Sequence, residues 1–240
     1  MTTHHTEAQR PSDASTDSTW VVIPAFNEGR GIAAVVAATL ECFPNVVVID
    51  DGSSDDTAAQ ALQAGAVVVT HPVNLGQGAA LQTGFDWAQR VSARWVVTLD
   101  ADGQHDPQDA RRMLALAEIR QLDAVLGSRF LGNTVGMPRS RRLLLQAALR
   151  FQNLTTGLRL TDVHNGLRVL SARAIQHIEL QQDRMAHASE IVSQLARSTL
   201  RIEEAPVTIR YTAQTLAKGQ SAWGALHILI DLAMARLGRW

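Results

Sequence analysis

Short β-branched segments alternate with alanine-rich helical segments along the first half of this 240-residue chain. Such alternation is typical of parallel strands joined by crossover helices. It predicts an α/β fold with a Rossmann-like, mostly parallel central sheet that is flanked by helices. We expect the strands at residues 20–24, 46–50, 66–70, 95–100 and 124–127, and the helices at residues 31–43, 56–64, 78–91 and 107–120.

The composition suits one packed domain, because hydrophobic residues make up 46% of the chain. Residues 1–18 are polar and lack an apolar core, so we expect a disordered tail and not a secretory signal. The one cysteine, Cys42, can form no disulfide within the chain, which favours a reducing cytoplasm. No stretch reaches the roughly 18 apolar residues that a membrane span requires.

The pattern changes after residue 129. Residues 129–168 hold seven arginines and one acid, a block that favours a phosphate or an anionic membrane surface, with a solvated helix face as the alternative. Further helices are expected at about 138–156 and 186–197, and a strand near 202–211. Residues 221–240 predict an amphipathic C-terminal helix, which either completes the core or rests on a membrane.

Polar clusters follow four of the expected strands. In open α/β sheets, ligands bind beyond the carboxyl ends of the strands, which meet at one edge. Here the clusters occupy residues 24–28, 50–55, 100–105 and 128–129. Their convergence predicts a single site at that edge of the sheet.

Two acids one residue apart, Asp100 and Asp102, follow the fourth strand. In an extended chain, side chains at i and i+2 point the same way. Two bare carboxylates about 4 Å apart would repel by roughly 4 kcal/mol at an effective dielectric near 20, so the pair needs a proton or a cation. Hard oxygen ligands favour Mg²⁺ or Mn²⁺ over zinc. The alternative is a loop in which these acids cap the next helix.

Four ordered motifs carry a resemblance to a known family: PAFNE at 24–28, VIDDGSSDDT at 48–57, LDADGQHDP at 99–107 and GSRF at 127–130. Together they resemble family-2 glycosyltransferases of the GT-A fold, and within that family the dolichol-phosphate mannosyltransferase and polyprenyl-phosphate sugar transferase branch. The resemblance implies a GT-A domain over residues 19–220. It also implies metal-dependent, inverting transfer of a sugar from a nucleotide-sugar donor to a polyprenyl phosphate.

The resemblance also implies roles for individual residues. Its nucleotide-binding positions correspond to Pro24, Ala25, Glu28, Asp51 and Asp100. Its metal ligands correspond to Asp100, Asp102 and Gln104. Its catalytic positions correspond to Asp102, Arg129 and Asp162. The residues expected to bind the acceptor phosphate are Arg129, Arg139 and Ser140. The branch commonly carries an arginine over the diphosphate, shortly before a Gly-x-Ser step, and this chain has no arginine there. We expect Lys218 to substitute as the diphosphate cation, with Arg210 as the alternative. His105 is either a further ligand or a neighbour of one, and Glu190 is either a site residue or a surface acid of a helix.

The acceptor is inferred from an absence in the sequence. Related enzymes that attack with a sugar hydroxyl often draw a general base from a Glu-Asp pair, and no such pair occurs here. An acceptor phosphate is already anionic and needs only cations to position it, which suits arginine. The alternative is transfer to a hydroxyl of a lipid-linked saccharide or a polysaccharide.

These expectations place the protein at the inner face of the cytoplasmic membrane, in peripheral contact with it. The partners are a nucleotide-sugar donor and a polyprenyl-phosphate acceptor, together with a membrane anchor subunit or a second copy of the chain. No nucleic acid is expected. The sequence does not choose the donor sugar or the nucleotide.

Overall fold

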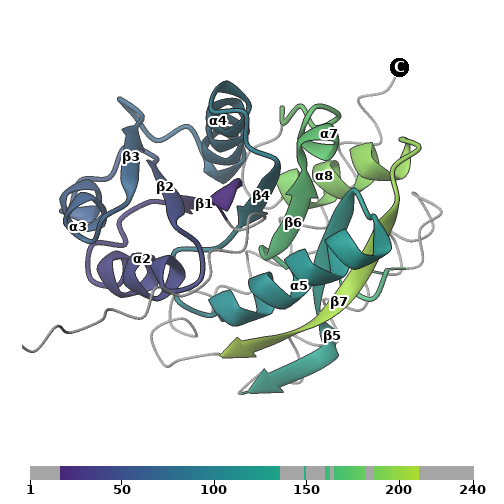
Figure 1. Cartoon of the computed structure of the whole chain (residues 1–240). Helices are drawn as coiled ribbons and strands as arrows, with labels where there is room; N and C mark the ends of the chain where they lie inside the picture. The colour runs from purple at the N-terminus through teal and green to yellow at the C-terminus, as the bar shows by residue number, and fades with distance from the viewer. Residues whose placement is uncertain (1–16, 136–148, 150–159, 163–164, 182–185, 211–240) are drawn as a thin grey trace, which may run out of the picture.

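The computed structural model describes residues 17–135, 149, 160–162, 165–181 and 186–210. Within them, one seven-stranded sheet has the order β3-β2-β1-β4-β6-β5-β7 (Figure 1). The strands are β1 Thr19–Ala25, β2 Asn45–Asp50, β3 Val67–Thr70, β4 Trp95–Thr98, β5 Ala124–Val135, β6 Arg168–Ser171 and β7 Ile202–Arg210. The helices are α2 Ile32–Leu40, α3 Thr57–Gln63, α4 Gln77–Arg90, α5 Pro107–Arg120, α7 Ala172–Ile175 and α8 Ala186–Ala196. The predicted α/β class is confirmed.

The sheet is parallel except around β6. Strand β1 pairs in parallel with β2 and β4, β2 with β3, and β5 with β7. Strand β6 runs antiparallel between β4 and β5. This short strand was not predicted, because its four residues, which begin with an arginine, are too few to show a periodic pattern.

Side chains that alternate along the central strands form two hydrophobic cores, one on each face of the sheet. In β1, Val21 and Ile23 face the core that α2, α3 and α5 complete, while Val22 faces the core of α4, α7 and α8. Figure 1 shows α4 and α7 on one side of the sheet, with α2 and α5 on the other. Burial on both faces explains why these strands read as continuous apolar runs.

Local signals fix the helix that follows β4. The side chain of Asp106 accepts a hydrogen bond from the backbone N of Gln108 at 2.9 Å, and Pro107 occupies the first helical turn. The helix ends at Gln121, which adopts a left-handed conformation with φ of 54°. Helix α5 therefore has the bounds that the sequence predicted.

Strand β5 continues well past its predicted end, with an irregularity between Ser128 and Asn133 in its pairing with β7. The hydroxyl of Ser128 accepts hydrogen bonds from the backbone N of Phe130 at 3.2 Å and of Leu131 at 3.3 Å. A Cβ at Gly132 would lie 2.2 Å from the carbonyl oxygen of Val207, so only glycine fits this close approach. Such irregularities re-aim a side chain, and Arg129 lies within this one.

Several expectations lie outside the described residues. These are most of the tail at residues 1–18, the helix at 138–156 and the C-terminal helix at 221–240. The domain bounds therefore remain predictions. In the part of the chain that the structure describes, no helix is long and apolar enough to cross a membrane.

Candidate active site

A cavity of about 460 Å³ opens at the carboxyl ends of β1, β2 and β4, beside the irregular stretch of β5. Eight of the residues predicted for the site line it: Pro24, Ala25, Glu28, Asp51, Asp100, Asp102, Gln104 and Arg129. The predicted convergence of polar clusters at one sheet edge is confirmed. Asn74 and Gly76, from the loop between β3 and α4, and Gln77, the first residue of α4, complete part of the wall.

The loop after β1, which carries Glu28, is fastened to the loop after β2. The backbone N of Glu28 donates to the Thr57 hydroxyl at 2.8 Å, and the backbone N of Gly29 donates to Asp55 at 3.0 Å. Burial acts to raise the pKa of Asp55, but hydrogen bonds from Thr57 and Gly29 outweigh it and hold this pKa below its usual value. These contacts fix the wall that carries Glu28.

Asp51 holds the loop between β3 and α4. Its Oδ1 atom lies 2.8 Å from Nδ1 of His71 and accepts from the backbone N of Leu75, while Oδ2 accepts from the backbone N of Gly76. The other ring nitrogen of His71 lies 2.9 Å from the Thr83 hydroxyl. Asp51, predicted to bind the nucleoside, thus shapes the cavity wall through both carboxylate oxygens. His71 was not predicted, although it follows β3 at the same sheet edge.

Asp100 is held by donors on two sides. Its Oδ2 atom lies 3.1 Å from Nε2 of His105, and its Oδ1 atom accepts from the side-chain amide of Gln77 at 3.2 Å. A Cβ at Gly166 would lie 2.2 Å from Oδ2, so the carboxylate packs directly against a glycine. Burial acts to raise the pKa of Asp100, yet the hydrogen bond and charge of His105 and the charge of Arg168 lower it overall.

Asp102 faces the same cavity from a turn. Strand β4 ends at Thr98, and Gly103 in the turn has a φ of 71°. The expectation that an extended strand aligns the two acids was therefore wrong in its geometry. Gln104 donates to Asp102 from its backbone N at 3.0 Å and from its side-chain amide at 2.6 Å. Burial and then the charge of Asp100 raise the pKa of Asp102, so the two carboxylates interact.

This pair fits a hard divalent cation. Repulsion between Asp100 and Asp102 is relieved when a positive charge lies between them. The amide nitrogen of Gln104 faces Asp102, which leaves the amide oxygen as its ligand atom. Among the described residues, no group of three or more His, Cys, Asp or Glu could hold a metal by itself. Mg²⁺ fits such a sparse set, because it takes one or two carboxylates and completes its shell with water and substrate phosphates.

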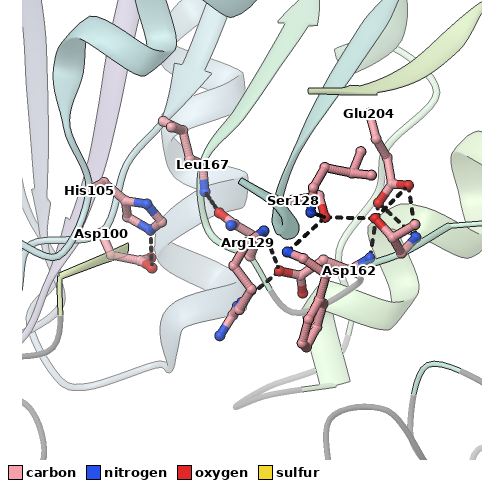
Figure 2. Close-up of polar contacts among 11 residues, drawn as sticks. Asp100, His105, Ser128, Arg129, Asp162, Leu167 and Glu204 are labelled. Carbon is pink, nitrogen blue, oxygen red and sulfur yellow. Dashed lines mark hydrogen bonds and ion pairs between the residues drawn. The ribbon is translucent and has the colours of Figure 1, made fainter. Parts of the chain in front are cut away.

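Arg129 enters the cavity from the opposite side, backed by Asp162. Oδ2 of Asp162 accepts from the backbone N of Arg129 at 3.1 Å and from its Nε at 2.6 Å, as Figure 2 shows. The side chains are 8% and 2% exposed, respectively, so this is a buried ion pair. Asp162, predicted to be catalytic, lies behind Arg129 and not in the cavity wall. Arg168 is buried nearby. Burial lowers its pKa overall, although the negative charges of Asp100 and Asp162 act to raise it.

Some predicted residues lie elsewhere. Arg139, Ser140 and Lys218 fall outside the described residues. Glu190 does not line the cavity, and its carboxylate oxygens lie 3.2 and 3.3 Å from the backbone N of Gln181, which donates to them. The contact of Gln77 with Asp100 was missed, because a Gly-Gln-Gly step before a helix reads as a tight turn.

Comparison with known proteins identifies the family. The sequence profile of Glycosyl transferase family 2 matches residues 20–178. An uncharacterized protein of Methanocaldococcus jannaschii is 31% identical over 94% of this chain and 95% of its own length. The UDP-N-acetylglucosamine–dolichyl-phosphate N-acetylglucosaminyltransferase of Methanococcus voltae is 27% identical over 92% and 96% of the two chains. The undecaprenyl-phosphate mannosyltransferase of Micrococcus luteus is 28% identical over 91% and 92%.

A solved structure shows the same fold. Glucosyl-3-phosphoglycerate synthase from Mycobacterium tuberculosis, in complex with Mn²⁺, UDP-glucose and phosphoglyceric acid, superposes with a TM-score of 0.67 at 20% identity. The match covers 89% of this chain and 78% of that one. The predicted GT-A architecture is thereby confirmed, and the names of the relatives support the polyprenyl-phosphate branch. The chain belongs to glycosyl transferase family 2 and is a glycosyltransferase.

Proposed function

We propose that this enzyme transfers a sugar from a nucleotide-sugar donor to a polyprenyl phosphate at the inner face of the cytoplasmic membrane. The observation that carries the proposal is a cavity with two aspartates on one side and the buried Arg129 on the other. Two relatives similar over nearly the whole chain are named for transfer to dolichyl phosphate and undecaprenyl phosphate.

The donor occupies the half of the cavity around β1 and β2. Pro24 and Ala25 supply an apolar edge for the base, and the carboxylate of Glu28 accepts hydrogen bonds from base or ribose. Asp100, Asp102 and Gln104 hold Mg²⁺ or Mn²⁺, which when bound neutralises the charge that builds on the departing nucleoside diphosphate. Lys218 is proposed as a further cation for the diphosphate.

The acceptor occupies the half around Arg129. A lipid phosphate is already ionised at neutral pH, so its oxygen can attack without a general base. Because Asp162 accepts a hydrogen bond from the Nε of Arg129, the guanidinium is held at a fixed angle, and the planar geometry of a guanidinium suits pairing with phosphate oxygens. Arg139 and Ser140 are proposed to complete this clamp. Direct in-line attack on the anomeric carbon then inverts its configuration.

The proposed acceptor places the enzyme at a membrane. Its phosphate lies at the membrane surface, so a peripheral enzyme is sufficient to reach it. The C-terminal helix predicted at residues 221–240 would rest on that surface, with a membrane anchor subunit or a second copy of the chain as further proposed partners.

A panel of nucleotide sugars, incubated with Mn²⁺ and either undecaprenyl phosphate or undecaprenol, tests this proposal. We expect one sugar to be transferred to undecaprenyl phosphate and none to undecaprenol, which differs only in lacking the phosphate. Asp102→Ala should abolish transfer, whereas Asp86→Asn, on the exposed surface of α4, should not. Transfer to undecaprenol or to a phosphate-free glycan at an equal rate would overturn the proposal.

A further inference from the structure

We propose that Glu204, on β7, is the positioning residue that aims Arg129 at the acceptor phosphate. The inference rests on the proposed function, because it assigns Arg129 to the acceptor. Glu204 belongs to none of the predicted motifs and does not line the cavity. It lies behind the site, and Figure 2 shows it on the far side of Asp162 from the cavity residues Asp100 and His105.

The carboxylate of Glu204 gathers donors from one short segment. The backbone N of Thr161 lies 2.9 Å from Oε1 and 2.8 Å from Oε2, and the backbone N of Asp162 donates to Oε1 at 2.9 Å. The hydroxyl of Thr161 donates to Oε2 at 3.0 Å. Two consecutive peptide N–H groups are thus tied to one side chain, which fixes the backbone from which the Asp162 carboxylate projects.

A second connection reaches the irregular stretch of β5. The hydroxyls of Thr161 and Ser128 lie 2.6 Å apart. Since Thr161 gives its proton to Glu204, it accepts one from Ser128, and Ser128 in turn accepts from the backbone N of Phe130 and Leu131. Each hydrogen bond in this series is therefore donated toward Glu204, starting from the backbone N–H groups of the β5 irregularity and ending at the carboxylate. A charged acceptor at the end strengthens such a chain.

Both connections meet at Arg129. Asp162 holds its backbone N and its Nε, and Ser128 is the residue before it. Glu204 therefore fixes Arg129 in two ways: through Asp162, the ion-pair partner of Arg129, and through Ser128, its neighbour in β5. Partial burial raises the pKa of Glu204, while the hydrogen bonds from Asp162 and Thr161 act in the opposite direction, so these donors stabilise its charged form.

The adjacent residue supplies a matched control. Glu203 has the same side chain on the same strand, but it pairs with Arg120 on the surface at 2.5 Å and does not contact the Thr161–Asp162 segment. Glu203→Gln and Glu204→Gln therefore make the same chemical change at neighbouring positions. Only the second places an NH₂ group against donors that need an acceptor.

The test is steady-state kinetics of sugar transfer with the donor and undecaprenyl phosphate varied separately. Glu204→Gln should raise the KM for undecaprenyl phosphate at least about tenfold, the factor expected when a hydrogen bond to a charged group is lost. The KM for the donor should stay within about twofold. Glu203→Gln should match the wild-type enzyme in both constants.

A double-mutant cycle separates positioning from general structural damage. If Glu204 acts through Arg129, adding Glu204→Gln to Arg129→Ala should raise the acceptor KM no further. Thr161→Val, which removes the hydroxyl connection, should raise that KM, and Thr161→Ser should restore it. This pair also decides the matter if Glu204→Gln does not fold.

Equal acceptor KM values for Glu204→Gln and Glu203→Gln, or for Thr161→Val and Thr161→Ser, would overturn the inference. Additive effects in the cycle would do the same. Failure of the proposed function is a separate result, because it is seen in the wild-type enzyme alone as an absence of transfer to undecaprenyl phosphate.

Discussion

His105 and Asp100 form a hydrogen-bonded pair in which Nε2 and Oδ2 lie 3.1 Å apart and the His105 side chain is 4% exposed. An ionised carboxylate can only accept, so Nε2 carries the proton. Nδ1 of His105 has no hydrogen-bond partner among the described residues. The imidazole therefore contacts Asp100 through Nε2, and this hydrogen bond stabilises the ionised carboxylate of Asp100 at the cavity wall.

This pairing predicts how the cation site responds to substitution. Glutamine places an amide NH₂ near the position of Nε2, so His105→Gln should bind Mn²⁺ within a few-fold of the wild-type affinity. His105→Ala leaves Asp100 without this donor and should weaken Mn²⁺ binding by about 10–100-fold. Titration of Mn²⁺ followed by electron paramagnetic resonance measures both affinities without turnover. Equal affinities for the two variants would show that His105 does not orient the aspartate.

We expect the ionised carboxylate of Asp102 to lower the free energy of unfolding. Its raised pKa means that the folded protein binds the proton more tightly than the unfolded chain, so this residue lowers stability as pH rises above the ordinary value of 3.8. In metal-free buffer at pH 7, Asp102→Asn should therefore raise the free energy of unfolding, by about 1 kcal/mol or roughly 2–4 °C in Tm.

The pH dependence checks that explanation. Below pH 3.8 the carboxyl is protonated in both states, so the advantage of Asp102→Asn should disappear there. Thermal melts of the two proteins between pH 3 and pH 8, with chelator present, measure the difference. A stabilisation that persists at low pH would mean that charge repulsion is not its cause.

His71 should stabilise the wall that Asp51 organises. His71→Ala leaves the buried Asp51 carboxylate short of a donor, which should lower the free energy of unfolding by about 1–3 kcal/mol. Asparagine can place an NH₂ near Nδ1, so His71→Asn should recover part of this loss, although the contact with Thr83 is gone. Urea denaturation measures both variants. Identical stability of the two would argue against the hydrogen bond to Asp51.

The sequence was informative where chemistry follows a strand in a fixed order. The acids after β2 and β4 could be placed at one sheet edge because parallel strands end together. The same reasoning failed for the geometry at Asp102, because strand β4 ends at Thr98, before both acids, and strand alternation does not extend past that point. Both acids line the cavity even so, and Gly103 supplies the positive φ of the turn that carries the second one.

The supporting residues could not be predicted from local pattern. Glu204 and Thr161 are 43 positions apart, and His71 reaches Asp51 across 20. Such pairs are created by sheet order, which places β5 beside β7 and leaves β6 between β4 and β5. An acid within a strand such as β7 is a hint that the sequence does offer, because a carboxylate that turns toward the interior needs partners.

The central claim is that Arg129 serves the acceptor while the aspartates opposite serve the donor. The most direct test is the KM of Arg129→Ala for undecaprenyl phosphate, measured at saturating donor and Mn²⁺. We predict a rise of about tenfold or more, as expected when a charge-assisted contact to phosphate is lost, with the donor KM unchanged. An unchanged acceptor KM, or a rise confined to the donor, would contradict the account.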